Sequence, residues 1–244
     1  MVVAYFDCFS GICGDMILGA LLDLGLDSNI LQKELKKLDI SGYNIHVKKV
    51  ESHSLAGSDI EIIVKEKQHQ RNLHDISKIL DESTLDQDIK TRSKQIFLKL
   101  ARAESKVHNT TVETIHFHEI GAVDSIIDIV GSVIGIKKLD ISTIFCSPLP
   151  LGKGFIECNH GILPVPAPAT VELLKNVPIY QTDRKQELVT PTGAAIITTL
   201  TQSFGDMPNM KITKIGYGAG KTKSQYPNLL RVFIGELEKK EKGL

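Results

Sequence analysis

The fold is decided by the amino-terminal stretch Val2-Val3-Ala4-Tyr5-Phe6-Asp7-Cys8-Phe9-Ser10-Gly11-Ile12-Cys13-Gly14-Asp15-Met16. Residues 2–6 form an apolar run that is typical of a short buried strand. Residues 8–14 contain two glycines and predict a tight loop. From Asp15 to Leu24 the apolar positions recur with helical spacing, and Gly25 ends this helix. The opening stretch therefore predicts a buried strand that is joined by a loop to a helix.

Strand and helix patterns alternate along the rest of the chain, without an internal repeat. Alternation of apolar and polar side chains predicts half-buried antiparallel strands at 43–50 and 59–65, and further strands are expected at 144–145, 210–217 and 229–235. Helices are expected at 29–38, 73–81, 87–106, 121–139, 168–176 and 191–202. This mixture predicts an α/β fold (mixed α+β), with a mixed sheet flanked by helices. We expect one globular domain over residues 1–236 and a charged tail at 237–244.

The composition argues against several classes of protein. Hydrophobic residues make up 42% and charged residues 24%, which is typical of a globular chain and not of a disordered one. The 29 Lys and Arg residues balance 29 Asp and Glu residues, so no overall field attracts nucleic acid or anionic membranes. No stretch has the ~20 apolar residues that cross a bilayer, and the amino terminus does not resemble a signal peptide. We therefore expect a cytoplasmic protein with reduced cysteines that binds neither nucleic acid nor a membrane.

Metal-binding residue types are concentrated in His116-Phe117-His118-Glu119-Ile120-Gly121-Ala122-Val123-Asp124-Ser125-Ile126-Ile127-Asp128. On an extended segment His116 and His118 project to the same side, because strand side chains alternate. From Gly121 the pattern becomes helical, which places Asp124 and Asp128 one turn apart on one face. Imidazoles ahead of a carboxylate-bearing helix suit a divalent cation such as nickel, copper, zinc or iron. The alternative is an exposed strand end before a helix whose acidic residues suit the helix dipole.

The loop after the first strand contains groups that suit an anion. Gly11 and Gly14 would let backbone N–H groups approach a phosphate at the amino end of the following helix. Asp7 would bind a cation or a ligand hydroxyl, whereas Asp15 is equally well explained as a helix cap or first-turn carboxylate. The Gly-Lys-Ser/Thr ending of a Walker A loop is absent.

Three further motifs carry candidate chemistry. Cys158 and His160 would share a face on a strand, either as a soft metal pair or a Cys–His nucleophile pair, or simply as a half-buried thiol beside a capped imidazole. Thr190 and Thr192 open a helix, as an ordinary cap or as a hydroxyl-lined anion site. The segment Gly216–Lys221 looks like a nucleotide loop but fails as a dinucleotide fingerprint, because a strand follows it instead of a helix.

Several of these motifs, in this order, resemble the LarC family of nickel-insertion proteins. The matching segments are Tyr5-Phe6-Asp7-Cys8-Phe9-Ser10-Gly11, Gly14-Asp15-Met16, His116-Phe117-His118-Glu119-Ile120-Gly121-Ala122-Val123-Asp124-Ser125, Pro164-Val165-Pro166-Ala167-Pro168-Ala169-Thr170, Thr190-Pro191-Thr192-Gly193-Ala194 and Gly216-Tyr217-Gly218-Ala219-Gly220. The resemblance implies a lyase-type enzyme that inserts Ni²⁺ into pyridinium-3,5-bisthiocarboxylic acid mononucleotide, the pincer cofactor of lactate racemase. It also implies that the insertion depends on CTP, accompanied by Mg²⁺ or Mn²⁺.

Within this hypothesis, the chemistry of the side chains indicates roles for individual residues. His116, His118 and Glu119 would pass Ni²⁺ to the sulfur atoms of the pincer ligand, while carboxylates orient the imidazoles or hold a second cation. Residues that would hold the ligand's phosphate are Ser10, Gly11, Gly14, Thr190 and Thr192. Catalytic roles would fall to Asp7, Asp15, Glu119 and Asp124. Metal contacts would come from His116, His118, Glu119, Asp124, Asp128, Cys158 and His160.

The chain departs from the family pattern in three places. Family members usually continue well beyond Glu236, and we expect much of the CTP chemistry in that carboxy-terminal part, as a separate chain or a missing domain. Many members carry a His-rich insert where this chain has only Lys67-Gln68-His69-Gln70-Arg71-Asn72-Leu73-His74, and Cys13 stands where Ser is expected. We also expect a homo-oligomer. Two other functions stay open: a metal-dependent phosphohydrolase, in which the His/Asp cluster activates water, and a non-catalytic nickel-binding module.

Overall fold

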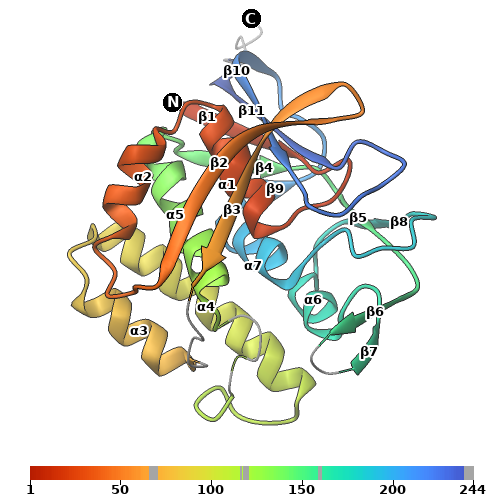
Figure 1. Cartoon of the computed structure of the whole chain (residues 1–244). Coiled ribbons are helices and arrows are strands. Elements are labelled where there is room, and N and C mark those ends of the chain that lie inside the picture. The colour runs from red at the N-terminus through yellow and green to blue at the C-terminus, as the bar shows by residue number, and fades with distance from the viewer. Residues whose placement is uncertain (66–70, 116, 118–120, 159–160, 239–244) are drawn as a thin grey trace, which may run out of the picture.

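A seven-stranded mixed sheet carries the helices in the computed structural model, which describes residues 1–65, 71–115, 117, 121–158 and 161–238 (Figure 1). The strand order across the sheet is β2-β3-β10-β11-β1-β4-β9. These strands are β1 (Val2–Asp7), β2 (Tyr43–Ser52), β3 (Leu55–Val64), β4 (Thr143–Cys146), β9 (Ser203–Phe204), β10 (Met210–Ala219) and β11 (Leu229–Leu237). β1 pairs in parallel with β4 and antiparallel with β11, so both senses of pairing meet at the first strand of the chain.

The helices are α1 (Gly14–Asp23), α2 (Ser28–Leu35), α3 (Leu73–Glu82), α4 (Gln87–Val107), α5 (Val123–Lys138), α6 (Pro168–Leu173) and α7 (Pro191–Leu200). α1 lies directly against β3, β10 and β11. α5 packs on α1, and α4 packs on α5, α6 and α7, so the helices form successive layers away from the sheet (Figure 1). None of the helices in the described part of the chain is both long and apolar enough to cross a membrane.

The core runs continuously from β1 through α1 into α5. Ala4 and Phe6 of β1 are almost fully buried and belong to the same apolar cluster as Leu18 of α1 and Val130 of α5. Gly131 lets the two helices approach, since a Cβ atom there would lie 2.9 Å from Leu18 Cδ2. Burying this much apolar surface is the main force that holds the layers together.

The predicted fold class, a mixed sheet flanked by helices, is confirmed. The opening strand, loop and helix form as predicted, with α1 over Gly14–Asp23. The expected antiparallel strands at 43–50 and 59–65 are the β2–β3 hairpin, in register from Tyr43 opposite Val64 to Ser52 opposite Leu55. The helix expected at 168–176 is shorter, since α6 ends at Leu173. It cannot extend to Asn176, whose φ of 64° is a left-handed conformation incompatible with an α-helix.

Two small sheets were not among the sequence predictions. β5 (Leu149–Leu151) pairs in parallel with β8 (Ile179–Gln181), and β6 (Phe155–Cys158) pairs antiparallel with β7 (Gly161–Pro164). These strands have three or four residues each, too few to show an alternating pattern. They form in the proline-containing segment that leads from β4 to α6 and α7, away from the main sheet (Figure 1).

Asp23, the last residue of α1, ties this helix to three strands. Its carboxylate accepts hydrogen bonds from Ser58 Oγ at 2.8 Å, from the Tyr217 backbone N–H at 2.9 Å and from the Lys49 ammonium. Burial by itself raises the pKa of Asp23, but the hydrogen bonds from Lys49, Tyr217 and Ser58 outweigh it and lower the pKa below its usual value. The ionised carboxylate therefore stabilises the folded state.

We predict that Asp23→Asn lowers the free energy of unfolding at pH 7 by about 1.5–3 kcal/mol, the usual contribution of hydrogen bonds to a charged group. A carboxyl whose pKa is lowered on folding stabilises above its unfolded pKa and loses that contribution as the pH falls. The difference between wild type and variant should therefore shrink below about pH 4. Urea unfolding at pH 7 and pH 3.5 measures it, with the exposed Asp39→Asn as control. An equal difference at both pH values would contradict the assigned role.

Candidate functional site

The amino ends of α1, α5 and α7 open onto one cavity of about 540 Å³. Residues from each helix end and one lysine line it, among them Gly14, Asp15, Asp124, Asp128, Thr190, Thr192 and Lys221. The first backbone N–H groups of a helix lack partners within the helix, and the helix dipole adds partial positive charge there. The cavity therefore combines three sources of positive potential with three aspartates.

Two glycines allow the helix ends to come this close. A Cβ atom on Gly14 would lie 2.7 Å from Asp128 Cβ and 2.7 Å from its Oδ2, so only glycine lets α1 begin beside this side chain. A Cβ atom on Gly193 would lie 2.5 Å from the Ile12 carbonyl oxygen. The loops before α1 and α7 are also joined directly, because the Thr190 N–H donates to the Ile12 carbonyl oxygen at 3.2 Å. Thr190 is the N-cap of α7, as predicted, and its Oγ1 accepts from the Gly193 N–H.

Asp15 and Lys221 form an ion pair across the cavity. Lys221 Nζ lies 3.3 Å from Asp15 Oδ2, while Asp15 Oδ1 accepts from the Met16 N–H at 2.9 Å and from the Cys13 thiol at 2.6 Å. Burial lowers the pKa of Lys221, but the carboxylates of Asp15, Asp128 and Asp59 together raise it, so the ammonium stays charged. Burial and Asp15 both raise the pKa of Cys13, which keeps this thiol protonated.

Asp128 is a carboxyl group of the cavity whose burial is poorly compensated. Its Oδ1 atom is buried and has no hydrogen-bond partner in the described part of the chain. Burial, followed by the charges of Asp15 and Asp124, raises the pKa of Asp128 well above its usual value, and Lys221 opposes this only in part. A carboxyl group in such surroundings gains stability from a bound cation, which replaces both the missing solvent and the missing partner.

The structure brings together six of the predicted site residues in this cavity: Gly14, Asp15, Asp124, Asp128, Thr190 and Thr192. Their roles toward a ligand or metal stay predictions. Within the residues that the structure describes, no three His, Cys, Asp or Glu side chains already form a metal-binding group. His116, His118, Glu119 and His160 lie outside the described residues, and Cys158 ends β6, which contributes nothing to the cavity.

Three predicted residues have their polar groups engaged within the protein. Asp7 Oδ2 accepts from Arg231 Nε at 3.0 Å and from its terminal nitrogen at 2.5 Å. Ser10 Oγ donates to the Pro227 carbonyl oxygen at 2.5 Å and accepts from Arg184 at 2.9 Å. The Gly11 N–H donates to the Cys8 carbonyl oxygen at 2.9 Å, so this amide closes the loop. None of the three lines the cavity.

Lys221 and Glu187 also line the cavity but were not predicted. Lys221 ends the segment Gly216–Lys221, which fails as a dinucleotide fingerprint because a strand follows it instead of a helix. The available signal was a lysine two residues after a glycine-containing strand. Its significance depends on α1, which places Asp15 beside it.

Helix amino ends and carboxylates around one cavity of a mixed-sheet α/β protein offer suitable surroundings for a cation together with an anionic ligand. Comparison with known proteins identifies the family. The chain belongs to the nickel insertion protein family, whose model matches residues 4–243.

Curated relatives agree with this assignment. A protein of Dictyoglomus thermophilum named "Putative nickel insertion protein" is 52% identical over 97% of this chain and 61% of its own length. Proteins of Desulfitobacterium hafniense and Acetivibrio thermocellus, each named "Pyridinium-3,5-bisthiocarboxylic acid mononucleotide nickel insertion protein", are both 50% identical, over 100% and 99% of this chain. The chain spans about 60% of the length of these relatives. No solved structure matches it.

We predict that Asp128→Asn stabilises the metal-free protein at neutral pH. A carboxyl whose pKa is raised on folding favours the folded state at low pH, and this contribution is lost as the pH rises from the unfolded pKa, about 4, toward the folded one. Asparagine cannot ionise, so the variant should unfold at higher urea than wild type at pH 7 and at nearly the same urea at pH 4. The measurement is made with a chelator present.

Asp39→Asn is the control, because Asp39 is exposed and does not line the cavity, so its replacement should change stability little at either pH. Loss of stability in Asp128→Asn at pH 7 but not at pH 4 would show that Asp128 is ionised and paired. That result would contradict the buried, unpaired environment described above.

Proposed function

We propose that this chain carries out the metal-handling part of nickel insertion into pyridinium-3,5-bisthiocarboxylic acid mononucleotide, the ligand named for its relatives. The observation that carries the proposal is the cavity in which Asp15, Asp124 and Asp128 meet the amino ends of three helices. Ni²⁺ is the substrate here and needs acidic or imidazole donors before transfer. The ligand's carboxyl-derived groups are anionic, and helix amino ends stabilise such groups.

In this proposal the carboxylates share the cation with His116, His118 and Glu119, which we call the histidine arm. Asp124 and Asp128 hold Ni²⁺ or a second cation at the start of α5, and Asp15 approaches from α1. In the sequence, Glu119 comes three residues before Ala122, and Ala122 lines the cavity. Imidazole is a better nickel ligand than carboxylate, so transfer runs from the arm to the ligand's sulfur atoms while the aspartates balance charge.

The ligand side of the cavity is formed by Gly14, Thr190 and Thr192. In the proposal, the N–H groups at the start of α1 and α7 and the Thr192 hydroxyl receive anionic groups of the mononucleotide. Ser10 and Gly11 act indirectly by fixing the loop before α1. Asp7 holds Arg231 against the rings of Phe9 and Phe233, which secures the end of β1.

The wider features of the proposal come from the family resemblance. They are a dependence on CTP with Mg²⁺ or Mn²⁺, a carboxy-terminal part that supplies the CTP chemistry, classification as a lyase, maturation of lactate racemase, a homo-oligomeric state and a location in the cytoplasm. The length of the relatives, of which this chain spans about 60%, supports a further part. The apolar cluster that the sheet and helices share supports one domain over residues 1–236.

We predict that nickel binding, measured by calorimetry on this chain, weakens at least tenfold in His116→Ala/His118→Ala and in Asp124→Asn/Asp128→Asn, because each change removes donors from the same cation. His46→Ala is the control, since His46 lies on β2 and does not line the cavity. Equal nickel binding by wild type and both double variants would overturn the proposed site. Loss in the histidine variant alone would restrict the nickel site to the arm.

A further inference from the structure

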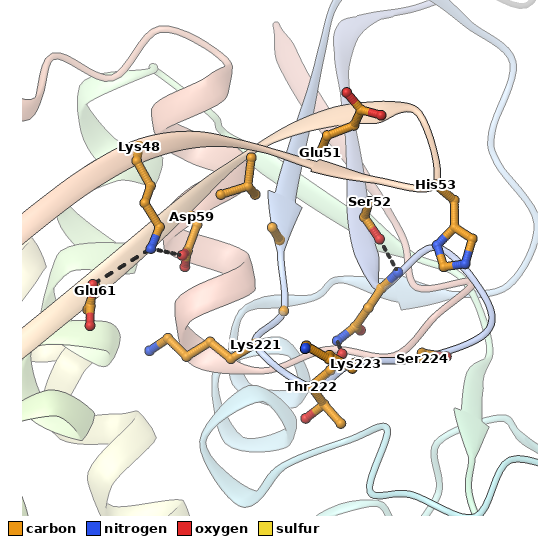
Figure 2. Close-up of a pocket in the computed structure, with 14 residues that line it drawn as sticks. Lys48, Glu51, Ser52, His53, Asp59, Glu61, Lys221, Thr222, Lys223 and Ser224 are labelled. Atoms are coloured by element: carbon orange, nitrogen blue, oxygen red, sulfur yellow. Dashed lines mark hydrogen bonds and ion pairs between the residues drawn. The ribbon is translucent and has the colours of Figure 1, made fainter.

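A second cavity, of about 580 Å³, opens between the β2–β3 hairpin and the segment that follows β10 (Figure 2). We call it the polar groove and define it by its lining residues Ser52, Asp59, Glu61, Lys221, Lys223 and Asn228. Its volume lies in the range of about 300–1,000 Å³ that small-molecule sites occupy. Lys221 lines both this groove and the cavity at the helix ends. The other residues of the groove have no part in the proposed nickel site.

Charge is divided between the two walls of the polar groove. The hairpin wall carries Asp59 and Glu61, and Lys48 Nζ lies 3.3 Å from Asp59 Oδ2 and 3.7 Å from Glu61 Oε2 (Figure 2). The Lys48 ammonium therefore pairs with two carboxylates, so this wall keeps carboxylate oxygens that can accept further hydrogen bonds. The opposite wall carries Lys221 and Lys223 (Figure 2). A ligand that fits has an anionic end and a hydroxyl-bearing end.

The wall that carries the lysines is held in place by hydrogen bonds. The Asn228 N–H donates to Ser52 Oγ at 3.1 Å, which joins this segment to the hairpin (Figure 2). Asn228 Nδ2 donates to the Thr222 carbonyl oxygen at 2.9 Å, and the Gly220 N–H donates to the Asn228 carbonyl oxygen at 3.0 Å. The groove is therefore formed before any ligand arrives, which lowers the entropic cost of binding.

Lys223 has no ion-pair partner in the described residues, whereas Lys221 is paired with Asp15. The Lys221 side chain runs from the polar groove toward the start of α1, so its ammonium stands between the two cavities. A ligand that contacts both lysines with one anionic group would have its other end free to enter the cavity at the helix ends.

We infer that the polar groove binds a sugar phosphate, with Lys221 and Lys223 on the phosphate and Asp59 and Glu61 accepting hydrogen bonds from the sugar hydroxyls. The inference rests on the proposed function, and it assigns the ribose phosphate of the mononucleotide to this groove. The metal-binding ring then lies in the cavity at the helix ends, where its thiocarboxylate groups meet the amino ends of α1 and α7. Lysine ammonium groups and phosphate form charge-assisted hydrogen bonds, the strongest kind available here.

The test uses ribose 5-phosphate as the probe, followed by calorimetry and by amide chemical shifts of the whole chain. We expect shifts at residues 52–53 and 219–224, and Lys223→Ala should weaken binding at least tenfold. Asp59→Asn/Glu61→Gln should weaken ribose 5-phosphate binding but leave binding of inorganic phosphate unchanged. Lys185→Ala, an exposed lysine that does not line the groove, is the matched control. The thermal midpoint of each variant shows that it folds.

Equal affinity of Lys223→Ala and Lys185→Ala, or shifts centred on Thr190 and Thr192, would overturn the inference. Nickel binding is measured on the same proteins to separate the two claims. Nickel binding that depends on Asp128 together with no ribose 5-phosphate binding removes the groove assignment and keeps the nickel site. Ribose 5-phosphate binding that depends on Lys223, without nickel binding, supports the groove and overturns the proposed function.

Discussion

The rest of the structure depends on the close approach of α1 to β10. A Cβ atom on Gly218 would lie 1.8 Å from the Met16 carbonyl oxygen, and one on Gly216 would lie 2.6 Å from the Ala20 carbonyl oxygen. The helix backbone therefore rests on the strand backbone with no side chain between them. This contact fixes where α1 begins, and so it places Asp15 beside Lys221, which follows Gly218 by three residues.

The cavity at the helix ends stabilises charge of both signs. Helix amino ends favour anions, whereas the aspartates favour cations, and each compensates for the desolvation of the other. Asp128 shows the cost of the arrangement, because its Oδ1 atom is buried without a partner in the residues described. Such a carboxyl group destabilises the folded state as long as no cation is bound. Local destabilisation of this kind is a common cost of a functional site.

The amino-acid sequence predicts the long elements well, because each has enough residues to show a period. The unit from Val2 to Leu24, the β2–β3 hairpin and the helix at 87–106 all form as expected. The short strands β5 to β9 could not be predicted, since pairing between distant segments creates them. Asp15, Asp124 and Thr192 were each predicted from their chemistry, but their meeting in one cavity and the part played by Lys221 depend on tertiary contacts. The histidine arm at 116 and 118 stays a prediction.

Lys221 borders both the cavity at the helix ends and the polar groove, and this gives the two cavities a thermodynamic connection. An anion that draws the ammonium into the groove frees Asp15 from its ion pair, which increases the negative charge available to a cation. A cation on Asp15 displaces the ammonium in turn and leaves it to the anion. Linkage makes the two effects equal in free energy, so each ligand raises the affinity for the other by the same factor. If the proposed function and the groove assignment hold, this one lysine makes nickel and nucleotide bind cooperatively.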